Sequence, residues 1–267
     1  MTGSNRPDRP TGARAGSTSA TALVGALTAG VALLAPTPAP AHFSWLSATL
    51  VEERLAFVPQ FGHHLPAQRV LSVDRIDSAM AFDPDGQATP TERTDQSLSI
   101  AVGAPGTYVL SARLHPRFWS RTTEGGRNAS RRDYPDAFSC RASIDTVTTL
   151  VNTGETKSSV AQAAGHDFEL VAQQDPSRLS AGDLLEVLIL FRGQPWQGSL
   201  HGTWTGYEPD HDDDYPVSVE TDQRGIAQIA LSRRGGWLLW ASTREPYADP
   251  EICDEQAWNA TLTFEVP

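Results

Sequence analysis

Apolar and polar side chains alternate along several short stretches of the chain, a pattern typical of half-buried β-strands. The clearest stretches carry apolar residues at every second position: Leu98, Ile100 and Val102, then Tyr108, Leu110, Ala112 and Leu114, and finally Leu262, Phe264 and Val266. Segments rich in Gly, Pro and Asp separate them, and only 142–151 fits a helix as well as a strand. The pattern predicts an all-β protein of the β-sandwich type.

Composition divides this β protein further. Residues 153–165 are rich in Gly, Ser, Thr and Ala and poor in large apolar residues, which indicates a linker. We therefore predict two β-sandwich domains, 42–158 and 159–267, of which the second has the length and turn spacing of a seven-stranded sandwich. In the first domain, 117–136 carries several arginines and is predicted to be a long loop.

The first 41 residues have the three parts of a secretory signal peptide. A basic segment with three arginines precedes an apolar stretch at 20–35, and Ala39-Pro40-Ala41 supplies the small residues that signal peptidase requires. The apolar stretch is too short for a convincing membrane span, and no twin-arginine pair precedes it. We therefore expect export by the general secretory route to the periplasm or the exterior, with His42 as the new amino terminus.

The charge and the cysteine content limit the partners and the compartment. The formal charge is −11, and removal of 1–41, which carries a net charge of +2, leaves −13 for the rest. Such a chain repels nucleic acid and anionic lipid and attracts cations. The two cysteines, Cys140 and Cys253, form an even pair, which predicts a disulfide in an oxidising compartment.

Two strand-like stretches on either side of Val51-Glu52-Glu53 predict a β-hairpin at the start of the exported part. If Leu50 faces Arg54, the strand pairing places His42 opposite Gly62. Because opposite residues in a hairpin have Cβ atoms about 5 Å apart, His42 then lies beside the next residues of the second strand.

Those next residues are His63 and His64. Strict alternation places His64 on the face of His42, but a bulge at Gly62 would exchange the two, so both remain candidates. An amino-terminal histidine offers an α-amine and a ring nitrogen, a pair that suits nickel, cobalt or copper better than calcium or magnesium. The arrangement predicts a transition-metal site formed by His42 with His63 or His64. The remaining histidines are weaker candidates: a surface position for His115, a strand start for His166, an exposed strand face for His201 and an acidic loop tip for His211.

Motifs of common enzymes are absent from the sequence, including Gly-x-Ser-x-Gly, His-Glu-x-x-His, Cys-x-x-Cys and phosphate-binding glycine loops. This absence favours a non-enzymatic role. The tryptophans in strand-like runs are better explained by core packing than by sugar stacking.

Several short motifs in order along the chain resemble one bacterial family. They are HFSWL at 42–46, FGH at 61–63, PGTY at 105–108, PRFWS at 116–120, GH at 165–166, GQP at 193–195, TDQRG at 221–225, GW at 236–237 and PEICD at 250–254. The chain resembles the NikM-like exported proteins, described as periplasmic components of nickel or cobalt uptake. The resemblance implies a metal role for His42 and His63, and a second domain of transthyretin or carboxypeptidase-regulatory type, which carries no chemistry of its own.

These observations favour an exported protein that captures a divalent transition metal, nickel or cobalt before copper, and passes it to a membrane transporter. Two alternatives remain open. One is a copper oxygenase that uses the amino-terminal histidine chelate, and the other is a structural surface β-sandwich protein in which the histidines are incidental.

Overall fold

The computed structural model describes a nearly all-β protein, which confirms the predicted fold class. The described residues from 42 to 267 belong to one compact unit. The predicted signal peptide, 1–41, lies outside the described residues, which are 42–154, 160–211 and 214–267. In this described part, no helix is long and apolar enough to cross a membrane.

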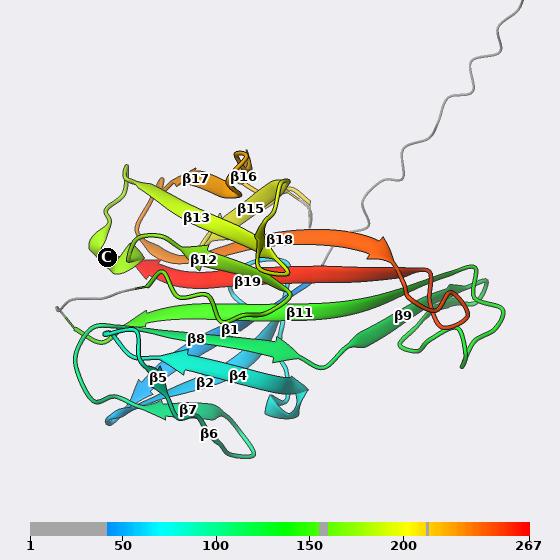
Figure 1. The fold of residues 1–267 in the computed structure, drawn as a ribbon, viewed down its shortest axis with the longest axis horizontal. Helices are drawn as coiled ribbons and strands as arrows, with labels where there is room; N and C mark the ends of the chain where they lie inside the picture. The colour runs from blue at the N-terminus through cyan, green and yellow to red at the C-terminus, as the bar shows by residue number, and fades with distance from the viewer. Residues whose placement is uncertain (1–41, 155–159, 212–213) are drawn as a thin grey trace, which may run out of the picture. The chain divides into compact units, whose positions relative to one another are not determined.

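A ten-stranded sheet forms the centre of the described structure (Figure 1). Its main path runs in the order β16 (Val217–Glu220), β15 (Ser199–Trp204), β18 (Gly235–Pro246), β19 (Glu255–Val266), β11 (Ser139–Asn152), β8 (Thr107–Leu114), β4 (Ile76–Phe82) and β5 (Ala88–Thr89). Off this path, β9 (Arg117–Thr122) pairs with β11 and with β10 (Gly125–Arg127).

Two smaller sheets accompany the large one. The five-stranded sheet contains β1 (Phe43–Val51), β2 (Arg54–Gly62), β7 (Leu98–Ala101), β6 (Glu92–Arg93) and β3 (Arg69–Val70). The four-stranded sheet contains β12 (Phe168–Ala172), β13 (Leu184–Phe191), β14 (Gln194–Pro195) and β17 (Ile226–Ala230). Two short 3₁₀ helices, η1 (Val73–Arg75) and η2 (Pro176–Arg178), lie in the connections.

The small sheets cover opposite faces of the large one. On β8, Val109 belongs to the hydrophobic core shared with the four-stranded sheet, whereas its neighbour Leu110 belongs to the core shared with the five-stranded sheet. Successive side chains of a strand point to opposite faces, so the two cores lie on the two sides of the large sheet. The result is a layered sandwich of three sheets.

The large sheet continues across the predicted domain boundary. That boundary falls within 155–159, outside the described residues, but β11 before it and β19 after it pair in parallel from Arg141↔Glu255 to Thr149↔Thr263. Sequence periodicity identifies strands, but it does not identify the distant partner that a parallel strand takes.

Two local predictions were wrong. The stretch predicted as a loop at 117–136 contains the β9–β10 hairpin, whose buried residues Ser120 and Thr122 are polar, so no apolar alternation marks it. The first hairpin is shifted by one residue, because Leu50 pairs with Leu55 rather than with Arg54. Its loop is the two-residue turn Glu52-Glu53, in which Glu52 has a φ of 55°.

Candidate functional site

The corrected hairpin register decides which histidine meets His42. Phe43 pairs with Gly62. The residue before Phe43, which is His42, therefore lies opposite the residue after Gly62, which is His63. Their ring centroids lie 3.9 Å apart, with the ring planes tilted by 47°. His63 is 2% exposed, whereas His42 is exposed. The predicted convergence of the two segments is therefore present, and His63 is the histidine that contacts His42.

His64 lies in a different environment. Its Nδ1 lies 3.4 Å from the hydroxyl oxygen of Thr203 on β15, and its ring centroid lies 5.3 Å from that of Tyr215. Tyr215 also contacts His201, whose ring stacks on Trp240 with a centroid distance of 4.5 Å. His64 therefore belongs to an aromatic group that includes Tyr215, His201 on β15 and Trp240 on β18.

The placement of His201 corrects another expectation. The alternation along β15 predicts an exposed ring, but His201 is half-buried against Trp240. Burial disfavours the charged imidazolium and lowers the pKa of His201, and Glu220 opposes this shift. His115 and His211 are exposed, as expected for surface positions.

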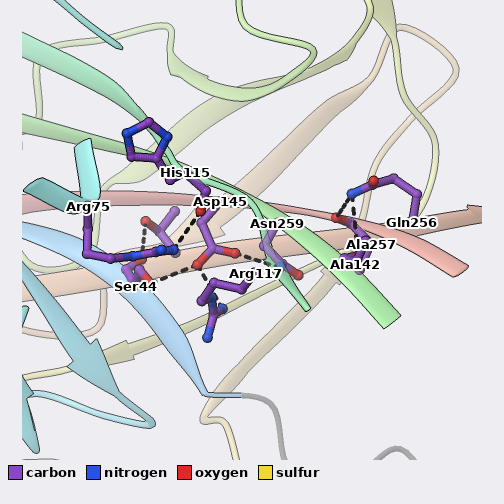
Figure 2. A network of polar contacts seen from close by, with 10 residues as sticks. Ser44, Arg75, His115, Arg117, Ala142, Asp145, Gln256, Ala257 and Asn259 are labelled. Atoms are coloured by element: carbon purple, nitrogen blue, oxygen red, sulfur yellow. Dashed lines mark hydrogen bonds and ion pairs between the residues drawn. The ribbon is translucent and has the colours of Figure 1, made fainter. Parts of the chain in front are cut away.

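Near its start, β1 is fixed to the large sheet by a buried carboxylate that binds Ser44 (Figure 2). Asp145 on β11, which is 3% exposed, accepts hydrogen bonds from the Ser44 hydroxyl at 2.8 Å, from Arg117 at 2.9 Å and from the Asn259 amide at 2.9 Å. Ser44 lies only two residues after His42. The Thr261 hydroxyl donates to the Ser44 carbonyl oxygen at 2.8 Å, so both the side chain and the backbone of Ser44 are held.

A second arginine lies near this carboxylate. Arg75 at the end of η1 donates to the His115 carbonyl oxygen at 2.5 Å. Burial lowers the pKa of Arg75, the charge of Arg117 lowers it further, and Asp145 opposes both effects. The polar network below β1 thus contains two guanidinium groups and one carboxylate.

Phe61 links this network to the histidines. The His42 ring stacks on the Phe61 ring at 5.0 Å with an interplanar angle of 8°. The guanidinium carbon of Arg117 lies 5.3 Å from the centroid of the Phe61 ring, and that of Arg69 on β3 lies 4.4 Å from it. Phe61, Arg69, Arg117 and Asp145 were not predicted as site residues from the sequence. Phe61 and Arg117 lie in the FGH and PRFWS motifs, but neither motif indicates a shared site, because the four residues come from four different strands.

Transition metals bind nitrogen ligands at about 2.0–2.1 Å, so two nitrogens on one ion are about 4 Å apart at most. The His42 and His63 ring centroids lie 3.9 Å apart, which places the two imidazoles in direct contact. Over the described ranges, no group of three or more His, Cys, Asp or Glu side chains gathers as a metal site would require.

The predicted disulfide is confirmed and lies away from the histidines. Cys140 at the start of β11 is bonded to Cys253 in the turn before β19, with the Cα atoms 4.8 Å apart. Arg131 donates to Asp254 at 2.6 Å, and the backbone N–H of Cys140 donates to the same carboxylate at 2.7 Å. These contacts fix the start of β11 to the turn before β19.

Fold and site together define an all-β protein whose first strand brings two histidines together beside a buried polar network. The chain belongs to the family described as domain of unknown function DUF4198, whose profile matches residues 39–245. The match begins just before His42 and includes His63, Arg117 and Asp145. No curated protein matches the chain.

Among solved structures, the chain is similar to a crystal structure of native α2-macroglobulin from Escherichia coli spanning domains MG0-NIE-MG1. The identity is 11%, the TM-score is 0.20, and the similarity covers 80% of this chain and 69% of that chain. At this TM-score the likeness carries no structural or functional argument.

Proposed function

We propose that the protein is an exported binding protein for a divalent transition metal, nickel or cobalt in the first place, that supports metal uptake by a membrane transporter. The single observation that carries this proposal is the contact between the His42 and His63 rings, 3.9 Å apart. Cleavage of the predicted signal peptide after Ala41 would add the α-amine of His42. The ligand set would then be one amine and two imidazoles, a nitrogen-rich set that suits nickel, cobalt and copper.

The surroundings of the two histidines support such a role. Ser44 is held by Asp145 and Thr261, which limits the freedom of the strand that carries His42. A ligand held in place before the metal arrives loses less conformational entropy on binding. His63 is buried at the end of β2, whereas His42 is exposed. In this pair, His63 is therefore the fixed ligand and His42 is the ligand that is accessible to solvent.

The test uses protein exported with its own leader, with an intact mass that shows His42 as the first residue. Isothermal titration with nickel, cobalt and copper chlorides measures the affinity of this protein and of the His42→Ala and His63→Ala variants. We expect each variant to bind nickel at least about tenfold more weakly, because ligands are lost. His211→Ala, which removes an exposed histidine elsewhere, is the matched control and should bind like the wild type.

A second form separates the amine from the rings. A chain with one extra glycine before His42 keeps both imidazoles but moves the amine away from the His42 ring. We expect this form to lose as much affinity as the His42→Ala variant. Equal nickel affinity for the wild type, the extended form and both histidine variants would contradict the proposal. A preference for copper together with oxidant-dependent turnover would favour the oxygenase alternative.

A further inference from the structure

The site at His42 contains more positive charge than a site for a bare metal cation needs. The Phe61 ring contacts the His42 ring, and it also contacts the guanidinium groups of Arg69 and Arg117. Guanidinium groups this close to an aromatic ring are held by cation–π attraction and keep their N–H donors available.

The negative charge in the same place is already compensated. Asp145 is the buried carboxylate of this group, and it accepts hydrogen bonds from Ser44, Arg117 and Asn259. Arg69 is exposed, and the described part of the chain shows no carboxylate within ion-pair distance of it. With neutral histidines, the group formed by Arg69, Arg117 and Asp145 therefore has a net charge of +1, although the whole chain has a charge of −11.

An excess positive charge beside a metal site disfavours a free divalent cation and favours a ligand that brings negative charge with the metal. We propose that the site takes the metal as an anionic chelate with a small polycarboxylate, and that Arg69 binds a carboxylate of the chelator. This inference rests on the proposed function, because the metal itself would be held by His42 and His63.

The coordination chemistry fits such a ternary complex. A six-coordinate ion that receives three nitrogens from the protein keeps three positions for a tridentate chelator. The protein nitrogens displace waters from the chelated ion, the chelator oxygens stay bound, and no electron is transferred. The His42 ring centroid and the Arg69 guanidinium carbon lie 5.0 Å and 4.4 Å from the centroid of the Phe61 ring, so both groups flank the same ring.

Equilibrium dialysis of the correctly processed protein against nickel chloride and radiolabelled citrate tests the inference. We expect the wild type to retain nickel and citrate in equal amounts, and to retain little citrate without nickel. The Arg69→Gln variant should retain at least fivefold less citrate. It should bind nickel from the chloride at least as well as the wild type, because a positive charge beside the cation is gone.

Matched variants and a second chelator complete the experiment. Arg69→Lys keeps the charge and should retain most of the citrate, whereas Arg178→Gln removes an exposed arginine at η2 and should behave like the wild type. The nickel complex of diethylenetriamine, a neutral tridentate chelator, should bind at least fivefold more weakly than nickel citrate. Retention of nickel without citrate by the wild type, or equal citrate retention by the Arg69→Gln variant, would overturn the inference alone. Retention of neither nickel nor citrate would overturn the proposed function as well.

Discussion

Asp145 provides the sharpest test of how the first strand is held. Its side chain accepts three hydrogen bonds, of 2.8 Å from Ser44, 2.9 Å from Arg117 and 2.9 Å from Asn259. Replacement by alanine removes all three acceptor contacts and leaves the Arg117 guanidinium without its ion-pair partner. We expect Asp145→Ala to destabilise the fold and to loosen the strand that carries His42.

The structure allows the size of this effect to be estimated. Removal of one partner of a buried ion pair costs about 3–5 kcal/mol. The Asp145 side chain is 4% exposed, but that of Arg117 is 35% exposed and keeps contact with water when Asp145 is absent. The lower end of the range, about 3 kcal/mol, is therefore the expected loss. For a domain of this size, that loss lowers the Tm by roughly 6–12 °C.

Urea denaturation of the oxidised protein, followed by tryptophan fluorescence, measures the loss directly. Glu92→Ala is the matched control, because it breaks the Arg54–Glu92 pair, whose side chains are 39% and 69% exposed. An exposed pair contributes about 0–1 kcal/mol. Asp145→Asn keeps the shape and one acceptor oxygen and should lie between the two. If Asp145→Ala costs no more than Glu92→Ala, the buried network does not fix the strand.

Two further predictions concern the disulfide and the response to acid. The Cys140–Cys253 bond spans a sequence separation of 113, for which the chain-entropy treatment gives a stabilisation of about 4–5 kcal/mol. The double alanine variant should therefore unfold at a clearly lower urea concentration than the wild type. An unchanged urea midpoint would contradict this prediction. Burial, partly opposed by a hydrogen bond to the Ser111 backbone, lowers the pKa of His166 below its ordinary value of 6.5. The unfolded chain then binds a proton that the folded chain resists, so stability falls as the pH drops below 6.5. Urea midpoints at pH 7.5 and pH 5 should differ less for His166→Gln than for the wild type, and equal differences would refute the assignment.

Local sequence was sufficient for much of the fold and for part of the site. The alternation of Leu262, Phe264 and Val266 with Thr261 and Thr263 predicted a strand with two distinct faces, and β19 has them. An even pair of cysteines predicted the disulfide correctly. Both results depend on short-range periodicity or on covalent chemistry, which a single sequence carries directly.

Only the tertiary structure decided which histidine meets His42, and why the site is positively charged. A shift of one residue in hairpin register changes the residue opposite His42, and the two-residue turn at Glu52-Glu53 sets that register rather than any apolar pattern. The other face of β19 carries Thr261, whose hydroxyl donates a hydrogen bond to the backbone of β1 instead of facing water.

The remaining site residues are far apart in the sequence. Phe61, Arg69, Arg117 and Asp145 come from β2, β3, β9 and β11, and sheet pairing together with the packing of β1 brings them beside His42. Each of them, taken alone, is an ordinary strand residue. Their chemistry depends on long-range pairing, which the periodicity of a single sequence does not encode.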